Sequence, residues 1–258
     1  MVAVAGYALA LLMGLTLGLL GAGGSILAMP IMVYFLNVQP IIATGYSLLV
    51  VGCTAMVGAI SYWKSGTVHL KKALAFATPA MFSVTITRAY VVPQLPAYIY
   101  GIPRDSFIML LFSALMLFAA LLMMFPQTPS SDKQESNLSK LTKLIFGSLF
   151  VGFLTGMVGA GGGFLIIPSL IAIFNFTVKE SIGTSLVVIT INSFAGFNGG
   201  LMTGLTIDWW LLGIFISMTL AGVLVGTTLG KKIQPQKLKQ LFAVFLIILS
   251  IIIFIREI

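Results

Sequence analysis

The sequence predicts an all-α integral membrane protein made of two homologous halves. Hydrophobic residues make up 59% of its 258 residues and charged residues 8%, and the mean hydropathy is +1.11. Such a chain does not stay soluble as a monomer, and it is long enough for about eight to ten membrane-crossing segments of roughly 20 residues. The halves are predicted from a repeat, since GLLGAGGSILAMP at 18–30 matches GMVGAGGGFLIIP at 156–168 at an offset of 138 residues (156 minus 18).

The repeat extends beyond these two segments. Between 18–48 and 156–186, 11 of 31 aligned pairs are identical, and they include glycines, a proline and the pair Asn37 and Asn175. Leucine and isoleucine match by chance in an apolar chain far more readily than these residue types, so duplication is the better explanation. Each repeated glycine costs a helix about 1 kcal/mol relative to alanine. We therefore expect one Gly-rich broken helix in each half.

The helices of the first half follow from its apolar runs. The first run has no basic residue before it, so we expect it to belong to the fold and not to a signal peptide. The next helix follows the glycine break, and Pro30 lies near its start, where a missing N–H costs least. The expected helices are 2–20, 26–36, 42–63, 74–92 and a run from the 103–105 turn to 124.

The second half repeats this order after the one polar stretch of the chain, PQTPSSDKQESNLSK, which is the natural linker. Its expected helices are 144–158, a segment after the second glycine break that ends at 174, and then 182–202, 209–229 and 238–255. Each half thus has four to five helical segments. The predicted organisation is a first transmembrane repeat at 1–125, a polar cytoplasmic linker at 126–143 and a second transmembrane repeat at 144–258.

The charges favour inverted repeats. Cytoplasmic loops carry the excess of Lys and Arg, and the basic segments here are 64–72, 126–143 and 231–239. If each broken helix crosses the membrane once, the first and last of these segments fall on opposite sides. If each broken helix returns to its starting side, all three face the cytoplasm and the Asp208 loop faces outward. We prefer this arrangement in the plasma (inner) membrane, and whether the short helix at 26–36 crosses fully or is re-entrant stays open.

The sequence contains no catalytic constellation and no nucleotide-binding GxxxxGK[ST] motif. Its single histidine, His69, rules out a His-cluster metal site, and its single cysteine, Cys53, excludes an intrachain disulfide. We therefore expect no enzymatic activity, no metal and no cofactor. The formal charge of +8 lies on membrane flanks, so nucleic acid is not an expected partner. The lipid bilayer is one, and a homo-oligomer is left open.

The paired GAGG(G)-x-[LI]-x-x-P segments, followed in the second half by KESIGTSLVVITINSFAGF, resemble the sulfite exporter TauE/SafE family, also described as toluene-sulfonate uptake permeases. The likeness covers essentially the whole chain. The first-half motif departs from the fuller pattern at Ser25, where that pattern has glycine. The resemblance implies a multi-spanning transporter of sulfur-containing anions such as sulfite, sulfonates or thiosulfate.

The residues themselves also predict an anion site. A helix that starts after an unwound glycine segment points free N–H groups and its positive dipole end into the break, and two such starts can hold one small anion, as where broken helices meet in several carriers. The competing interpretation is that the glycines only let helices pack closely. The candidate binding residues in the two segments are Gly21, Gly23, Gly24, Ser25, Gly159, Gly161, Gly162 and Gly163.

Polar residues at membrane depth extend this candidate site. Ser47 and Thr54 are seven residues apart, and so are Ser185 and Asn192, so each pair lies on one helix face. Thr184 is a further candidate. Hydrogen bonding between helices is the commoner role for a single hydroxyl. Asn192 is the strongest individual candidate, because a buried amide is costly.

Arg88 is the only strong charge well inside a predicted helix. Intramembrane arginine is expensive and usually functional, so Arg88 is a candidate to hold the anionic substrate. The alternative is that it snorkels to the interface. The first functional hypothesis is an alternating-access carrier for a small sulfur-containing anion. The others are an anion channel with a Gly-lined filter and a membrane scaffold that transports nothing.

Overall fold

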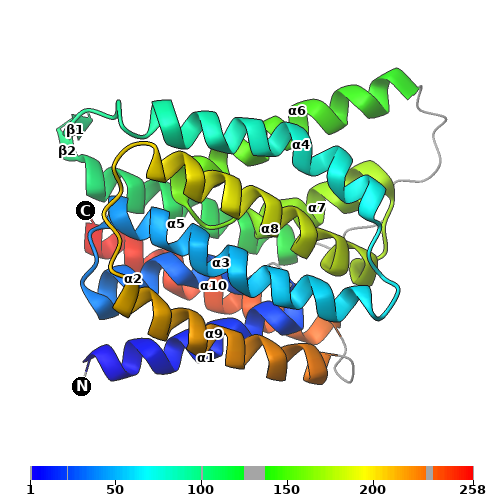
Figure 1. Ribbon diagram of the computed structural model, residues 1–258, viewed down its shortest axis with the longest axis horizontal. Helices are drawn as coiled ribbons and strands as arrows, with labels where there is room; N and C mark the ends of the chain where they lie inside the picture. Colours follow the sequence, from blue (N-terminus) through cyan, green and yellow to red (C-terminus); the bar gives the residue numbers. More distant parts are fainter. Residues whose placement is uncertain (1, 22, 100, 125–136, 231–234, 258) are drawn as a thin grey trace.

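The computed structural model describes residues 2–21, 23–99, 101–124, 137–230 and 235–257. As predicted, the described chain is mainly helical (Figure 1). The elements are α1 (Val2–Leu20), η1 (Gly23–Leu27), α2 (Ala28–Leu36), α3 (Pro40–Trp63), α4 (Leu70–Ile86), η2 (Thr87–Val91), β1 (Tyr98–Ile99), β2 (Ile102–Pro103), α5 (Arg104–Met124), α6 (Asn137–Val158), α7 (Gly163–Phe174), α8 (Val178–Leu201), α9 (Trp209–Gly230) and α10 (Pro235–Glu257). The turn η1 is 3₁₀-helical, η2 is π-helical, and the two strands form an antiparallel hairpin.

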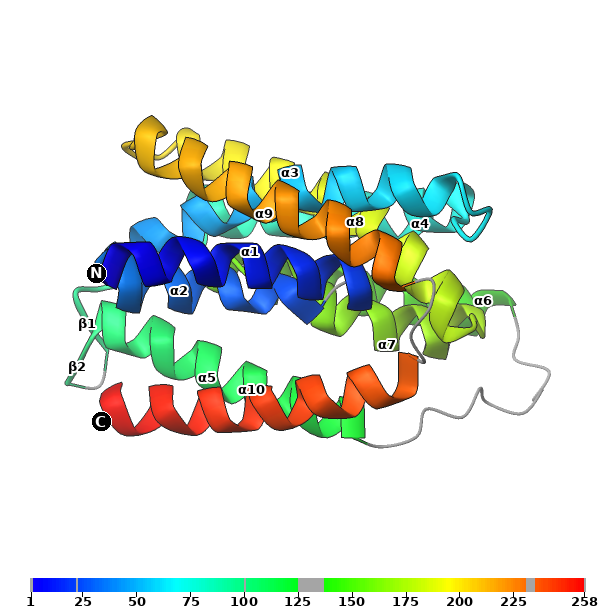
Figure 2. The same cartoon turned by 90° about the horizontal axis from the view of Figure 1, so that it is seen from below.

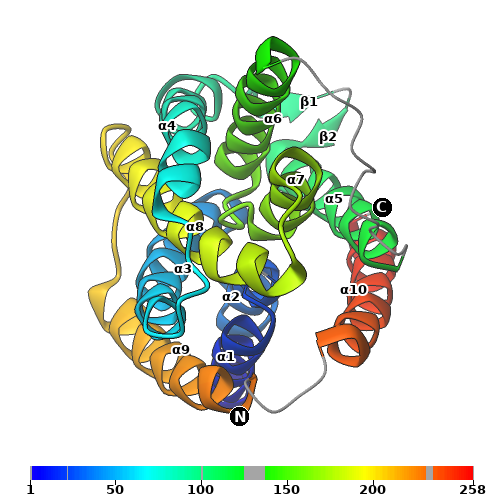
Figure 3. The same cartoon turned by 90° about the vertical axis from the view of Figure 1, so that its right-hand side faces the viewer.

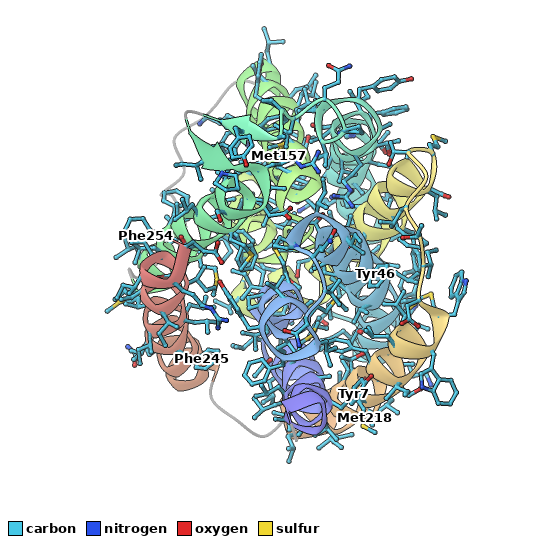
Figure 4. The ribbon with its side chains drawn as sticks, turned by 90° about the vertical axis from the view of Figure 1, so that its left-hand side faces the viewer. Tyr7, Tyr46, Met157, Met218, Phe245 and Phe254 are labelled. Carbon is cyan, nitrogen blue, oxygen red and sulfur yellow. The ribbon has the colours of Figure 1, made fainter. Side chains whose placement is uncertain are left out.

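Within the described residues, five helices are long and apolar enough to cross a membrane: Pro40–Trp63, Arg104–Leu122, Lys140–Val158, Val178–Leu201 and Trp209–Leu229. Large apolar side chains cover the outside of the bundle. Phe245 and Phe254 of α10, for example, are 43% and 50% exposed, whereas Tyr46 of α3 is 4% exposed (Figure 4). In a bilayer the exposed apolar side chains face lipid, which has no preference for polar atoms.

The long helices run side by side, and both chain termini lie at one end of the bundle together with the hairpin (Figures 1 and 2). In the end-on view of Figure 3, α8 crosses the middle and packs against α3 and α4, while α1 packs on α9 and α5 on α10. At the end opposite to the termini α3 ends and α4, α6 and α8 begin. That end therefore carries Lys64, Lys71, Lys72, Lys140, Lys143 and Lys179.

Glycines bring helix backbones into direct contact. A Cβ atom added at Gly14 of α1 would lie 2.0 Å from the carbonyl oxygen of Thr219 in α9, and one added at Gly222 would lie 2.1 Å from that of Leu11. Close approach of this kind is how small residues hold helices together in lipid. Similar backbone contacts are made by Gly18 and Gly226 between the same helices, and by Gly152 and Gly156 between α6 and α4.

The chain turns at both glycine segments. Between α1 and α2 lies η1, and α6 ends at Val158 while α7 begins at Gly163. Gly159, Gly161 and Gly162 have φ angles of +76°, +68° and +67°, in a region that residues with a Cβ atom adopt only at a cost. The second turn therefore requires glycine for its backbone conformation.

Several helices begin earlier than predicted; α8 begins at Val178 and not at 182, and α10 at Pro235 and not at 238. The helix α6 begins at Asn137 and not at 144, so residues 137–143 of the predicted linker are helical; residues 126–136 lie outside the described residues. The length of an apolar run does not show where this helix starts, because residues 137–143 include polar lysines and lysine favours a helix as well as leucine does. The predicted helix at 74–92 begins at Leu70, and its last turn is the π-helical η2.

Candidate functional site

The middle of the bundle is the crossing of α3 and α8. A Cβ atom added at Gly52 of α3 would lie 3.3 Å from Cβ of Ser193 in α8. The glycine segment before α7 reaches the same place, since a Cβ atom added at Gly161 would lie 2.6 Å from Cγ1 of Val51 and 3.1 Å from Oγ of Ser193. The crossing therefore brings the start of α7 against a polar side chain of α8.

Ser193 at this crossing and its neighbour in the sequence, Asn192, lack hydrogen-bond partners among the described residues. Asn192 and Ser193 are fully buried, and among the described residues neither amide atom of Asn192 nor the hydroxyl of Ser193 has a partner. Leaving a buried polar group unpaired costs roughly 1–3 kcal/mol. An exception of this kind in a folded protein calls for an explanation such as a water, an ion or a functional role.

The start of α7 is a helix end without a side-chain cap. Gly162 is its N-cap residue, and the backbone N–H groups of Leu165 and Ile166 both donate to the Gly162 carbonyl, at 3.0 and 3.1 Å. The N–H groups of the first turn precede these bonds and have no acceptor within the helix. The segment is buried, and η1 of the first half packs against α7. A buried helix start of this kind is suited to an anion.

Arg88 lies in η2 and is 3% exposed, so it does not snorkel to the surface. Its Nη1 donates a 2.7 Å hydrogen bond to the hydroxyl of Thr44, and its Nε has no partner among the described residues. An ion pair within the described residues joins His69 and Glu180 and does not involve Arg88. Arg88 is thus a buried cation without a carboxylate partner in the described protein.

The side chain of Arg88 faces a cavity of about 330 Å³, which we call the outer cavity. It is lined by Gln39, Ile41, Ile42, Arg88, Val92, Pro93, Gly200, Thr203, Gly204, Leu205 and Thr206. Several of these residues, such as Gln39, Thr203 and Thr206, are exposed. The outer cavity therefore leads from the surface to a buried guanidinium group.

Thr44 connects Arg88 to the second glycine segment. Its carbonyl oxygen would lie 2.2 Å from a Cβ atom added at Gly159. The hydroxyl of Ser47 donates a 2.7 Å hydrogen bond to the carbonyl of Gly159. Arg88, Ser47 and Gly159, which the sequence suggested separately, are thus brought together around a residue that the sequence did not suggest.

Other predicted site residues have partners within the protein. The hydroxyl of Ser185 donates to the carbonyl of Ile182 at 2.9 Å, and that of Thr54 donates to the carbonyl of Val50 and to Thr219. Thr184 accepts a 3.2 Å hydrogen bond from the backbone N–H of His69. These hydroxyl groups are thus hydrogen-bonded within their own helix, as for Ser185, or to another part of the protein, as for Thr54 and Thr184.

Several of the predicted glycines are close-packing positions. A Cβ atom at Gly24 would lie 2.4 Å from the backbone nitrogen of Leu17, and one at Gly162 would lie 2.0 Å from Oγ1 of Thr155. Gly21 lies against Ile182, near the start of α8. The helices α3 and α8 start at opposite ends of the bundle (Figure 1), so Gly21 and Gly159 do not face a common point. Gly23 and Ser25 lie in η1, and Gly163 begins α7.

Sequence reasoning missed Ser193, Thr44 and Gly200. Ser193 follows Asn192 in the small-residue run NSFAGFNGG, which is a signal for close packing but not for an unpaired hydroxyl. Thr44 and Gly200 matter only because the fold places them beside Arg88. The Nη2 atom of Arg88 would lie 3.4 Å from a Cβ atom added at Gly200. No local pattern indicates that contact.

The connections that follow α3 and α8 have the same construction. In each connection, a turn closed by backbone hydrogen bonds is followed by a residue that packs on a glycine near the start of the other helix of the pair, α8 for the first connection and α3 for the second. Thr67 covers Gly183, and Leu205 covers Gly45. The matching turn bonds are Ser65 N to Tyr62 O and Gly66 N to Trp63 O in the first connection, and Thr203 N to Gly200 O and Gly204 N to Leu201 O in the second.

The second connection is fixed to α3 by Tyr46. The Tyr46 hydroxyl donates to the carbonyl of Thr206 at 3.0 Å and accepts from the backbone N–H of Asp208 at 2.7 Å. Asp208 in turn accepts from the N–H groups of Trp210 and Leu211 at the start of α9. The residues at 203–206 line the outer cavity, so Tyr46 holds one wall of that cavity in place.

Helices of membrane-spanning length arranged around a buried polar centre define a multi-pass membrane protein. Residues 7–253 match the sequence profile described as Sulfite exporter TauE/SafE. The chain belongs to the TauE/SafE sulfite exporter family of membrane transporters, as its glycine motifs suggested.

Curated relatives support the class. A probable membrane transporter protein of Xylella fastidiosa (strain 9a5c) is 31% identical over 257 residues, covering 95% of this chain and 92% of the relative. The probable membrane transporter protein YunE of Bacillus subtilis (strain 168) is 26% identical and covers 94% and 93%. The probable membrane transporter protein MJ0441 of Methanocaldococcus jannaschii is 25% identical and covers 90% and 89%. No solved structure gives a significant match.

Proposed function

We propose that the protein is a secondary transporter that carries a small sulfur-containing anion, of the sulfite, sulfonate or thiosulfate type, across the plasma membrane. The anion class is supported by the description of its family. The observation that carries the proposal is the buried start of α7 beside the unpartnered hydroxyl of Ser193. Free N–H groups and a hydroxyl together offer hydrogen bonds and a positive helix end to an oxyanion.

We further propose that the halves α1–α5 and α6–α10 are inverted repeats. Equivalent helices run in opposite directions, since α3 begins where α8 ends (Figure 1). Contacts are also exchanged between the halves: Gly21 lies against Ile182, and Gly159 lies against Thr44. Both pairs of equivalent residues are 138 apart (159 minus 21, and 182 minus 44), the offset of the sequence repeat. If the halves exchange conformations, the opening moves from one side of the membrane to the other, as in carriers built from inverted repeats.

The lysine-rich end is the cytoplasmic end in this proposal, because short cytoplasmic loops carry the excess of Lys and Arg. The outer cavity lies at the other end, with the 202–208 connection and the hairpin. It therefore faces the outside of the cell.

A ligand-dependent thermal unfolding screen tests the proposed substrate class. The purified protein in detergent would be titrated with sulfite, thiosulfate, sulfate and methanesulfonate, and with neutral dimethyl sulfone and cationic tetramethylammonium as controls. We expect at least one sulfur anion to raise the unfolding temperature in a saturable way, since a ligand that binds only the folded state stabilises it. Stabilisation by none of the four anions would refute the proposal.

A further inference from the structure

The outer cavity is separate from the unpartnered side chains of Asn192 and Ser193. Along α8, Gly200 at the cavity is eight residues from Asn192 (200 minus 192), which is about 12 Å at 1.5 Å per residue. We propose that the outer cavity is a second anion-binding site, which takes up a small oxyanion from outside the cell through Arg88. This inference rests on the proposed function for the route that the anion then follows, but the binding site can be tested without any transport.

The charge of Arg88 is the main argument. The side chain is 3% exposed. Its Nη1 donates a hydrogen bond to the Thr44 hydroxyl, and its Nε has no acceptor among the described residues. A buried cation without a partner is costly, and inside membranes such residues mark ion pathways. The planar guanidinium group presents several N–H donors in a fixed geometry that suits two oxygens of one oxyanion. An anion in the cavity supplies the missing partner.

The glycines around Arg88 leave its donors uncovered. Nη2 would lie 2.9 Å from a Cβ atom added at Gly45 and 3.4 Å from one added at Gly200. A Cβ atom at Gly45 would press on the guanidinium group, whereas one at Gly200 would be in ordinary van der Waals contact with it. The cavity volume of about 330 Å³ falls near the lower end of ligand pockets, roughly 300–1,000 Å³. That volume suits a small anion with a few waters better than a bulky organic molecule.

The second half offers no equivalent charge. The residue 138 positions after Arg88 is Gly226, where an added Cβ atom would lie 2.3 Å from the carbonyl oxygen of Leu15. That position is needed for the contact between α9 and α1. The repeat thus supplies two similar halves, but Arg88 makes them electrostatically different, and anion uptake at this site is confined to one side of the membrane.

The test measures the local potential in the outer cavity with two thiol reagents of opposite charge. Thr203→Cys, which lines the cavity and is exposed, would be introduced into a Cys53→Ser background. Whole cells would be treated with methanethiosulfonate ethylsulfonate, itself a sulfonate, or with the trimethylammonium reagent. We expect the ratio of the labelling rate of the anionic reagent to that of the cationic reagent to be about tenfold higher at position 203 than at a Tyr98→Cys control. About tenfold is the lower limit of the rate increase that a charged cleft gives to a counter-ion.

Tyr98 is a matched control because it is 69% exposed, lies at the same end of the bundle and is not part of the cavity. Arg88→Gln should lower the ratio at position 203 to that of the control, and Arg104→Gln, which removes the same charge at the same end, should leave it high. If Arg88→Gln does not fold, the comparison of positions 203 and 98 with Arg88 intact still decides the matter. Equal ratios at the two positions would overturn the proposal, and so would labelling of position 203 only after permeabilisation.

Failure of this inference differs from failure of the proposed function. External sulfite should slow the labelling of Thr203→Cys by occupying the cavity, and this protection needs no substrate to cross the membrane. Protection without any transport would refute the carrier and keep the outer site. Transport that responds to Ser193 variants, with neither protection nor a rate ratio that depends on Arg88, would keep the carrier and refute the outer site.

Discussion

Ser185 and Ser193 are two serines on the same helix that differ in what surrounds them. Both are fully buried, but the hydroxyl of Ser185 donates to the backbone of Ile182 while that of Ser193 has no partner among the described residues. The sequence could single out Asn192, because an amide is costly to bury. It could not tell which serine is unpaired, because that depends on how α3 and the glycine segment pack against α8.

We therefore predict that Ser193→Ala lowers the stabilisation of the protein by a saturating sulfur anion by at least about 1 kcal/mol, the size of one hydrogen bond. Without ligand the unfolding free energy should not fall and should rise by up to about 1–3 kcal/mol, because the substitution removes an unpaired buried hydroxyl and no protein partner is lost. Thermal unfolding with and without sulfite measures both quantities. Ser185→Ala is the control and should keep the full anion effect; equal losses in the two variants would remove Ser193 from the site.

Gly162 is predicted to be required for the stability of the fold and not for anion binding alone. Alanine there must take up a positive φ, which costs about 1–2 kcal/mol, and its Cβ would lie 2.0 Å from Oγ1 of Thr155. Gly162→Ala should therefore lower the unfolding temperature of the protein in detergent. Adding Thr155→Ala should recover part of this loss, because the contact is removed while the φ strain remains. A single variant as stable as the wild type would contradict the geometry of this turn.

At the scale of elements, the apolar runs located most helices, because burial in lipid requires about 20 consecutive apolar residues. The helix α3, expected at 42–63, spans Pro40–Trp63, and α1 spans the expected 2–20. Polarity misled the prediction only where a helix leaves the apolar layer, as α6 does at Asn137–Lys143. The π-helical turn η2 was not predictable, since it depends on the packing of Thr87 and Arg88 against other helices.

The 202–208 connection gives an element-scale prediction. Tyr46→Phe removes one hydroxyl that accepts from the N–H of Asp208 and donates to the carbonyl of Thr206. The Asp208 amide should then exchange its hydrogen with solvent about fivefold faster or more, since one hydrogen bond contributes about 1 kcal/mol to local stability. Hydrogen exchange read by mass spectrometry checks this. The His69 amide in the other connection should be unaffected, and an unchanged Asp208 rate would show that Tyr46 does not hold this loop.

At the scale of the whole molecule, the sequence predicted a duplicated membrane protein and the family to which it belongs. Repeated glycines, prolines and asparagines carried that prediction, because they are tied to backbone geometry and not to general hydrophobicity. The outer cavity lay beyond sequence reasoning. Its walls come from the start of α3, from η2 and the residues just after it, from the end of α8 and from the 202–208 connection, and only tertiary packing brings them to Arg88.

The sidedness of the molecule is a further prediction. Cysteines placed at positions 71, 133 and 237 in a Cys53-free background should all be labelled from the cytoplasmic side, because the basic segments share one side in the inverted arrangement. Lys71 lies in the first turn of α4 and Lys237 in the first turn of α10, while Lys133 lies outside the described residues. An impermeant maleimide applied to intact and then permeabilised cells checks this. Labelling of position 237 from outside, with 71 protected, would contradict the inverted repeat.

Countertransport of sulfite most directly tests whether the protein is an alternating-access carrier. Proteoliposomes loaded with unlabelled sulfite would be given radiolabelled sulfite outside, at a series of concentrations. We predict that uptake saturates, that internal sulfite accelerates it, and that Ser193→Ala raises the half-saturating concentration by about tenfold, the equivalent of about 1.4 kcal/mol. A rate that rises linearly with concentration and ignores internal sulfite would contradict the carrier and indicate a channel, and no uptake of any sulfur anion would contradict transport altogether.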